Sequence, residues 1–298
     1  MYKVLVWGAG YGYSQYINLL KYQELLGELR IVGVTGKDDL YDYLDGYTFL
    51  SLEQARQEKI DYIVVTTESN YLQIVQEGLN LGFKREQFLQ ARVFAIPNFR
   101  FSNYIMLQSS KISVIAINCW GGLISHTLGL EFRSPFVNMF LEEQDYLKLL
   151  SDLDYYLGME LKLARYEMNH SLKREYPVCR LGDIELHFNH YVDMKEVESK
   201  WYRRLEKINW DNIFVMMYTS NENMAVEFDK LEYENKICFV PFESFLPSAY
   251  YVKMTTKGSM KNVPFWEIVN KTASGHYHDY DILDLLLCGK VGKVRICQ

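Results

Sequence analysis

Short runs of apolar and β-branched residues alternate with helix-like patterns over the first hundred positions. The runs that predict strands are residues 2–7, 29–34, 61–67 and 93–97. Residues 13–26 carry apolar side chains at helical spacing, and further helices are expected to begin at Ser51 and at position 69 or 70. Strands that alternate with helices form parallel sheets, so this region predicts an α/β fold of Rossmann-like type.

A second region with similar patterns follows Pro97, Asn98 and Phe99, where we predict a domain boundary. The strands expected there are 112–117, 137–141, 161–166, 176–180, 184–189, 213–218 and 236–242. The helices expected there are 142–156, 193–208, 224–231 and 281–287. The sequence therefore predicts a Rossmann-like domain over residues 1–100 and a larger α/β domain over residues 101–298.

A glycine loop follows the first predicted strand. Gly8 would permit a tight turn, and Gly10 would let a phosphate approach the backbone amides at the start of the next helix. The third glycine of a dinucleotide-binding fingerprint is replaced by Tyr13, and the acids Asp38 and Asp39 lie beyond the end of the second strand. The pattern therefore argues against NAD. Packing of helix on sheet explains both glycines slightly better than a ligand does.

Thr66 lies at the carboxyl end of the third predicted strand, the edge at which open parallel sheets bind ligands. With Gly8 and Gly10, it is a candidate for binding a nucleotide or a nucleotide sugar. The pattern does not identify the cofactor further.

Composition mainly excludes classes of partner. The 298 residues carry a net charge of −6, from 32 Lys and Arg against 38 Asp and Glu, so nucleic acid is not expected as a partner. The five cysteines lie far apart without a CxxC pair, which argues for a reducing compartment and against a zinc cluster. No apolar run is long enough to span a membrane and no signal-peptide pattern is present, so we expect a cytoplasmic protein without an integral membrane segment. A homo-oligomer is compatible with these totals.

Residues 112–146 form the most informative stretch of the second domain. An apolar run ends abruptly at Asn118, Cys119, Trp120 and two glycines, and a helix-like segment that contains His126 follows. A strand that leads through a special loop into a helix is how α/β proteins build sites at strand ends. We therefore expect the first wall of a functional site here.

The second domain also contains an ordered set of motifs. They are Asn118-Cys119-Trp120-Gly121-Gly122, Ser134-Pro135, Glu143-Gln144-Asp145-Tyr146, Tyr176-Pro177-Val178, Leu181-Gly182-Asp183, His187, His190-Tyr191, Lys200-Trp201-Tyr202-Arg203-Arg204, Ile208-Asn209, Asp211-Asn212, Phe228-Asp229 and Asn235-Lys236. In this order, over residues 112–289, they resemble a bacterial family called the domain of unknown function nineteen-nineteen, often labelled exopolysaccharide biosynthesis protein. The sequence departs from that pattern at 116–117 and at 284–287. The resemblance implies a surface-polysaccharide context and does not supply a reaction.

Four residues of this domain are candidates for catalysis. Helix-terminal amides could lower the pKa of the Cys119 thiol and make it a nucleophile for acyl transfer, with His187 or His190 as its base. Cysteine is also among the most buried residue types, and we favour a structural role for this one. Asp145, like the other acids of 142–145, could act as a general base or hold a metal. Their position at a predicted helix start is also explained by the helix dipole.

A basic stripe on the predicted helix 193–208 could clamp a diphosphate. Arg203 and Arg204 are the candidate ligands, together with Lys200 and Lys207. A solvated helix face is the commoner explanation of such a stripe.

Aromatic and histidine side chains supply further candidates. Trp120 and Trp201 could stack on a sugar, although Trp201 falls on the apolar face of its predicted helix. His276 and His278, with Asp279, share one predicted loop and could bind a metal.

Taken with the family resemblance, the pattern favours a cytoplasmic enzyme of bacterial surface-polysaccharide biosynthesis that transfers a glycosyl or related group from a nucleotide-linked donor to a small-molecule or glycan substrate. The alternative is a non-catalytic protein that binds a glycan or a partner. A third hypothesis, an NAD-dependent oxidoreductase, is weakened by Tyr13 and Thr35 at the two diagnostic positions.

Overall fold

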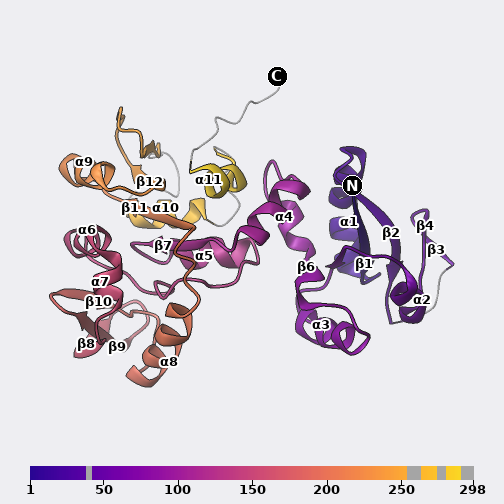
Figure 1. The fold of residues 1–298 in the computed structure, drawn as a ribbon, viewed down its shortest axis with the longest axis horizontal. Helices are drawn as coiled ribbons and strands as arrows, with labels where there is room; N and C mark the ends of the chain where they lie inside the picture. The colour runs from indigo at the N-terminus through magenta and orange to yellow at the C-terminus, as the bar shows by residue number, and fades with distance from the viewer. Residues whose placement is uncertain (38–41, 254–262, 274–279, 290–298) are drawn as a thin grey trace. The chain divides into compact units, whose positions relative to one another are not determined.

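The computed structural model describes residues 1–37, 42–253, 263–273 and 280–289. The chain divides into two compact units, Met1–Ile105 and Met106–Gln298, each with its own parallel sheet (Figure 1). The predicted α/β fold class is confirmed in both.

The sheet of the first unit has the strand order β2-β1-β5-β6, with every neighbouring pair parallel. Its strands are β1 (Tyr2–Trp7), β2 (Leu29–Thr35), β5 (Tyr62–Val65) and β6 (Phe88–Gln90). The elements that connect them are α1 (Tyr11–Leu25), the hairpin β3 (Tyr43–Leu44) and β4 (Tyr47–Thr48), α2 (Leu52–Gln57), α3 (Tyr71–Asn80) and η1 (Arg85–Gln87). The chain adds β2 on one side of β1 and then β5 and β6 on the other, so the direction in which strands are added reverses at β1.

Burial explains why this sheet needs helices on both faces. Leu5 and Trp7 pack on one face with Ile63, Ala55 of α2 and Val75 of α3. Side chains alternate along a strand, so the intervening buried residues of β1 point to the opposite face. A continuous apolar run is the expected result, and it is what residues 2–7 show.

The predicted strand at 93–97 is wrong. These residues begin within η2 (Ala91–Ala95), a short 3₁₀ helix that buries Val93 and Phe94, and the last strand of the sheet is β6. A short buried apolar run does not distinguish a strand from a turn of helix, which accounts for the error. The predicted cap at Ser51 is confirmed, because its hydroxyl accepts from the Gln54 amide while the Gln54 side chain accepts from the Ser51 amide.

Helix α4 (Phe101–Ser110) includes the division between the two units. The main sheet of the second unit has the order β13-β12-β11-β7 and is parallel throughout. Its strands are β7 (Ser113–Ala116), β11 (Ile213–Tyr218), β12 (Asn235–Val240) and β13 (Ala249–Tyr251). Its further helices are α5 (Trp120–Thr127), α8 (Met194–Leu205), α9 (Glu222–Lys230), α10 (Phe265–Thr272) and α11 (Ile282–Cys288).

A second, antiparallel sheet is inserted between β7 and β11 in the chain. Its strands, in the order β10-β9-β8, are β8 (Lys162–Asn169), β9 (Arg174–Leu181) and β10 (Ile184–His187). The predicted strand at 137–141 is wrong, because only Phe140 forms a bridge, to His187. Asn138 in this segment has φ +60°, a left-handed conformation that interrupts an extended run.

The helix predicted over 142–156 is two helices, α6 (Glu143–Ser151) and α7 (Leu153–Leu157). Asp152 separates them with φ −154° and ψ 69°, and its carboxylate accepts a hydrogen bond from the Tyr155 amide. An aspartate that caps a new helix competes with continuation of the old one, which explains the break.

Candidate functional site

Polar side chains meet at the carboxyl edge of the parallel sheet in the second unit. Cys119 follows β7 and Thr219 follows β11, and α6 begins at Glu143. The fully buried Thr219 hydroxyl donates a hydrogen bond of 2.9 Å to Oε2 of Glu143. Strand ends and a helix start are therefore joined at the edge where open α/β sheets bind ligands.

Burial gives this edge unusual electrostatics. Desolvation raises the pKa of Glu143, the hydrogen bond from Thr219 opposes that shift, and the nearby charge of Glu142 adds to it. The pKa of Tyr218 is raised to about 12, by burial first and then by Glu143, Glu142 and Cys119. Glu143, Glu142 and Cys119 therefore act electrostatically on Tyr218, and Glu143 is a carboxyl group that holds its proton more tightly than usual.

The thiol of Cys119 is not activated. The residue is partly buried, and burial raises the pKa of its thiol to about 11, opposed only by a backbone hydrogen bond. The lowering expected near a helix start is therefore present through this backbone hydrogen bond, but burial outweighs it. A protonated thiol can donate a weak hydrogen bond, whereas nucleophilic attack requires the thiolate.

The loop between β7 and α5 is held by α10. Asn118 donates through Nδ2 to Oδ1 of Asn270 at 3.0 Å and accepts from the Trp120 amide at 3.1 Å. The indole of Trp120 donates to the Thr272 hydroxyl at 2.8 Å. Because Trp120 is 0% exposed and Trp201 is 1% exposed, neither offers a ring face to a sugar, and that expectation is wrong.

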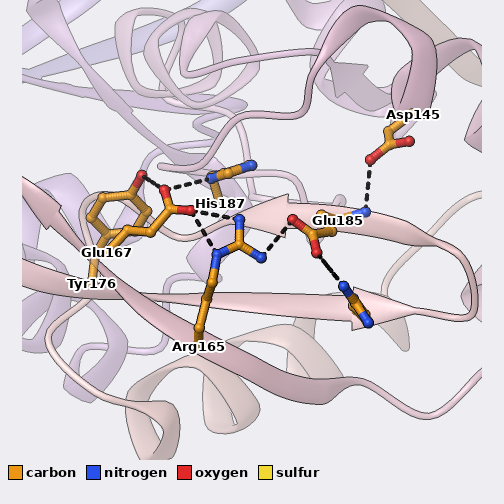
Figure 2. Close-up of polar contacts among 7 residues, drawn as sticks. Asp145, Arg165, Glu167, Tyr176, Glu185 and His187 are labelled. Atoms are coloured by element: carbon orange, nitrogen blue, oxygen red, sulfur yellow. Dashed lines mark hydrogen bonds and ion pairs between the residues drawn. The ribbon is translucent and has the colours of Figure 1, made fainter.

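His187 lies in a cluster on the antiparallel sheet, which Figure 2 shows. Its buried ring stacks on Phe140, with the ring centres 4.5 Å apart, and its Nδ1 is 3.6 Å from Oε2 of Glu167. The Tyr176 hydroxyl donates to the same carboxylate at 2.9 Å. His187 is therefore a packed residue beside an acid rather than a freely exposed base.

Asp145 belongs to the same cluster. Its Oδ2 accepts a hydrogen bond of 2.9 Å from the Glu185 amide, so it ties α6 to the start of β10. The Glu185 carboxylate pairs with Nη1 of Arg165 at 2.8 Å (Figure 2). It also accepts from Nε and Nη2 of Arg180 at 3.0 and 2.8 Å. The two arginines and Glu167 were not proposed from the sequence, because strands with unknown partners do not reveal which charges will meet.

His190 lies just beyond β10. Its backbone carbonyl accepts from Nη2 of Arg174 at 2.9 Å, and desolvation together with the Arg174 charge lowers the pKa of its ring. Within the described ranges of the chain, no hydrogen bond or ion pair joins Cys119 to His187 or His190. The nucleophile–base pair that the sequence suggested is thus not formed by direct contact.

The basic stripe of α8 does not converge on one point. Arg204 is buried and donates to the Tyr191 hydroxyl at 2.7 Å, whereas Arg203 is exposed. Lys200 pairs with Glu196 one helical turn away, and the other lysine of the stripe also pairs with an acid. The stripe therefore offers no ready clamp for a diphosphate.

The glycine loop of the first unit packs tightly against Thr66. Gly8 has φ +121°, and a Cβ there would lie 2.4 Å from the Thr66 hydroxyl oxygen. At Gly12 a Cβ would lie 2.0 Å from the Thr66 carbonyl oxygen. Gly10, which caps α1, has open space around its Cβ position. Close packing against Thr66 explains why residue 8 is a glycine. Gly10 is the position of this loop with space for a ligand.

Some candidates lie outside the described residues, namely Asp38, Asp39, His276, His278 and Asp279. Within the described part, no group of three or more His, Cys, Asp or Glu is placed to hold a metal ion. Cys119, Cys179, Cys238 and Cys288 are free thiols. A search of the described helices finds none long and apolar enough to cross a membrane.

The second unit is thus an α/β unit with a cluster of polar side chains at the carboxyl ends of its parallel strands. The chain belongs to the family described as Domain of unknown function (DUF1919), whose model matches residues 90–286. The resemblance read from the motifs is therefore confirmed. Residues 1–89 match a separate family described as C2185-like, N-terminal. A Haemophilus influenzae protein described as uncharacterized is 38% identical over 153 residues, which cover 49% of this chain and 70% of that protein.

Proposed function

We propose that this chain is a group-transfer enzyme of bacterial surface-polysaccharide biosynthesis, with its reaction centre at the carboxyl edge of the parallel sheet in the second unit. The observation that carries the proposal is Glu143, a partly buried carboxyl group with a raised pKa that is held by the Thr219 hydroxyl. Carboxyl groups with raised pKa values at strand ends are typical of general acid–base catalysts. The resemblance to proteins labelled for exopolysaccharide biosynthesis supplies the biological context.

The reaction that suits this arrangement transfers a glycosyl unit to a hydroxyl group. Glu143 would accept the proton of the acceptor hydroxyl as its oxygen bonds to the anomeric carbon of the donor. The bond from that carbon to the diphosphate oxygen would break, and the nucleotide would leave. Tyr218 and Cys119 are protonated at neutral pH, because burial raises the pKa of Tyr218 to about 12 and that of Cys119 to about 11, so both suit hydrogen bonding to substrate.

Binding of a nucleotide-bearing ligand by the first unit is the second part of the proposal, and it concerns that unit alone. The loop at Gly10 is open to a ligand and precedes the 15-residue helix α1, whose first amides suit a phosphate. The free thiols of the described region fit a cytoplasmic location, where such donors would be used.

Binding and turnover together test the proposal. Purified chain would be screened by thermal shift against nucleotide sugars, acyl-CoA and NAD, and stabilisation by a nucleotide sugar alone is the expected result. Glu143→Gln should retain that stabilisation and lose transfer to an acceptor glycan. Glu53→Gln is the matched control, because Glu53 is an exposed acid near the start of another helix. The proposal would be contradicted if none of the nucleotide-bearing ligands stabilised the chain.

A non-catalytic glycan- or partner-binding protein is the second candidate. It is favoured by the structural hydrogen bonds of Asn118 and Asp145, two residues of the ordered motifs. Cys119→Ala, His190→Ala and Asp145→Asn, made separately, address it. If cells that carry each variant, and also Glu143→Gln, make normal amounts of glycan, the catalytic proposal fails and the binding function is preferred.

A further inference from the structure

Strand β8 contains a bulge that changes which side chains share a face. In the pairing of β8 with β9, Lys162 lies opposite Arg180 and Arg165 lies opposite Val178. Ala164, between them in the sequence, has no partner residue on β9. Simple alternation would put positions 162 and 165 on opposite faces of the sheet. The extra residue shifts the alternation of side chains by one position. Lys162 and Arg165 therefore lie on the same face of the sheet as Arg180.

A cavity of about 650 Å³ lies beside this bulge. Its charged lining consists of Lys162, Arg165, Arg180 and one acid, Glu160. The volume falls within the range of small-molecule sites. Lys162 pairs with Glu160 at 3.1 Å, and the two arginines pair with carboxylates behind the wall, so an anionic ligand would bind to the cation edges that these pairs leave open.

The arginines at this cavity are held in place from one side. Nε and Nη2 of Arg180 donate to Glu185, and within the described residues its Nη1 makes no hydrogen bond. Arg165 is fixed between Glu167 and Glu185. Their side chains are 59% and 42% exposed, so a ligand can reach them. Guanidinium groups that are held in position in this way lose little freedom when they bind an anion.

The β9–β10 turn closes another side of the cavity. Gly182, part of its lining, has φ +59°, and a Cβ there would lie 2.6 Å from the sulfur of Met159. The next residue, Asp183, accepts from the Tyr156 hydroxyl at 2.9 Å and pairs with Lys148 at 2.7 Å. The turn is therefore held in place by Asp183. The motif Leu181-Gly182-Asp183 forms this turn and so shapes one side of the cavity.

We propose that this cavity is a binding site for the phosphate or carboxylate group of a sugar-sized ligand, with Arg180, Arg165 and Lys162 as the residues that recognise it. Arg180 makes the principal contact, because it has an unused N–H edge. This site does not depend on the transfer reaction proposed above, since it is built on a different sheet.

Calorimetric titration of the full chain tests this site with three probes: glucose 6-phosphate, glucuronate and neutral glucose. Saturable binding of at least one of the two anions, with a Kd of about 1 mM or below, and no binding of glucose is the expected result. The two anions separate a phosphate from a carboxylate ligand. Arg180→Gln should weaken binding at least about tenfold, the loss expected for one charge-assisted contact. Arg56→Gln, which removes an equally exposed arginine from a pair in the first unit, should leave binding unchanged.

Lys162→Gln provides a second variant if Arg180→Gln does not fold, because Lys162 is 71% exposed and supports no core packing. It should weaken binding several-fold. Equal binding of glucose and the anions would overturn the proposal. So would equal losses in Arg180→Gln and Arg56→Gln, or no saturation of folded wild-type chain at about 20 mM of either anion.

Discussion

The hydroxyl of Thr219 donates a 2.9 Å hydrogen bond to the carboxylate of Glu143, and so joins the end of β11 to the start of α6. Burial nevertheless raises the pKa of Glu143, because one hydrogen bond does not replace the water lost around a carboxylate. The contact holds the carboxyl group in place while the site keeps its proton affinity high.

Stability should depend on pH through Glu143. Its pKa is raised in the folded chain, so the folded state binds this proton more tightly, and stability falls as the pH rises from the unfolded to the folded pKa. Glu143→Gln should flatten this dependence and leave the chain at least as stable as wild type at neutral pH. Urea unfolding at several pH values between about 4 and 7 measures this.

The same variant should lose about 10²- to 10⁴-fold in transfer rate, the usual contribution of a general base. Glu53→Gln should change neither property. A variant at Glu143 that is less stable than wild type and fully active would contradict the assigned role.

Cys119 should react slowly with alkylating reagents. Burial raises the pKa of its thiol to about 11, so near pH 7.5 its thiolate fraction is on the order of 100-fold below that of an ordinary exposed thiol. Peptide mapping after a timed iodoacetamide pulse gives the comparison, with the exposed Cys288 as internal reference. Equal labelling of the two cysteines would restore the nucleophile hypothesis.

Two glycines of one loop should respond differently to the same substitution. Gly8→Ala should destabilise the chain by about 1–3 kcal/mol, because residue 8 has φ +121° and its Cβ would meet Thr66. Gly10→Ala should cost less than about 1 kcal/mol, because its Cβ position is open. Denaturant unfolding of the pair gives the difference directly, and similar losses would show that the loop is not packed as described.

The indole of Trp120 should matter through its hydrogen bond. Trp120→Phe keeps an aromatic ring in the core and removes the donor to Thr272, at a cost of about 1–2 kcal/mol. Trp266→Phe, on the exposed side of α10, is the matched control and should change stability by less than about 0.5 kcal/mol. Equal effects of the two variants would contradict a specific role for the indole hydrogen bond.

Sequence patterns predicted helices and strands better than they predicted which residues contact each other. The alternation of strand and helix predicted both parallel sheets, and the helix starts at Ser51 and at position 193 were predicted because capping is a local interaction. The strand predicted at 137–141 is wrong because Asn138 adopts a left-handed conformation, which the neighbouring residues in the sequence do not indicate. Local chemistry is readable in the sequence, whereas backbone exceptions of this kind follow from tertiary packing.

The candidate site was only partly predictable for the same reason. The loop at Cys119 and the acids of α6 were identified at a strand end and a helix start, where such groups are expected. Their electrostatic environment depends on Tyr218 and Thr219, at the end of a strand and just after it, and Thr219 lies 76 positions after Glu143. The face shared by Lys162 and Arg165 depends on one unpaired residue in a ladder, and no periodicity in the sequence indicates it.

The bond between Asn118 and Asn270 has a consequence for synthesis of the chain. The two residues are 152 positions apart, and a ribosome adds about 5–20 residues per second, so the second is made about 8 to 30 s after the first. During that interval the nascent chain carries Trp120 without the helix that later covers it. Folding of the second unit should therefore finish only after α10 is translated.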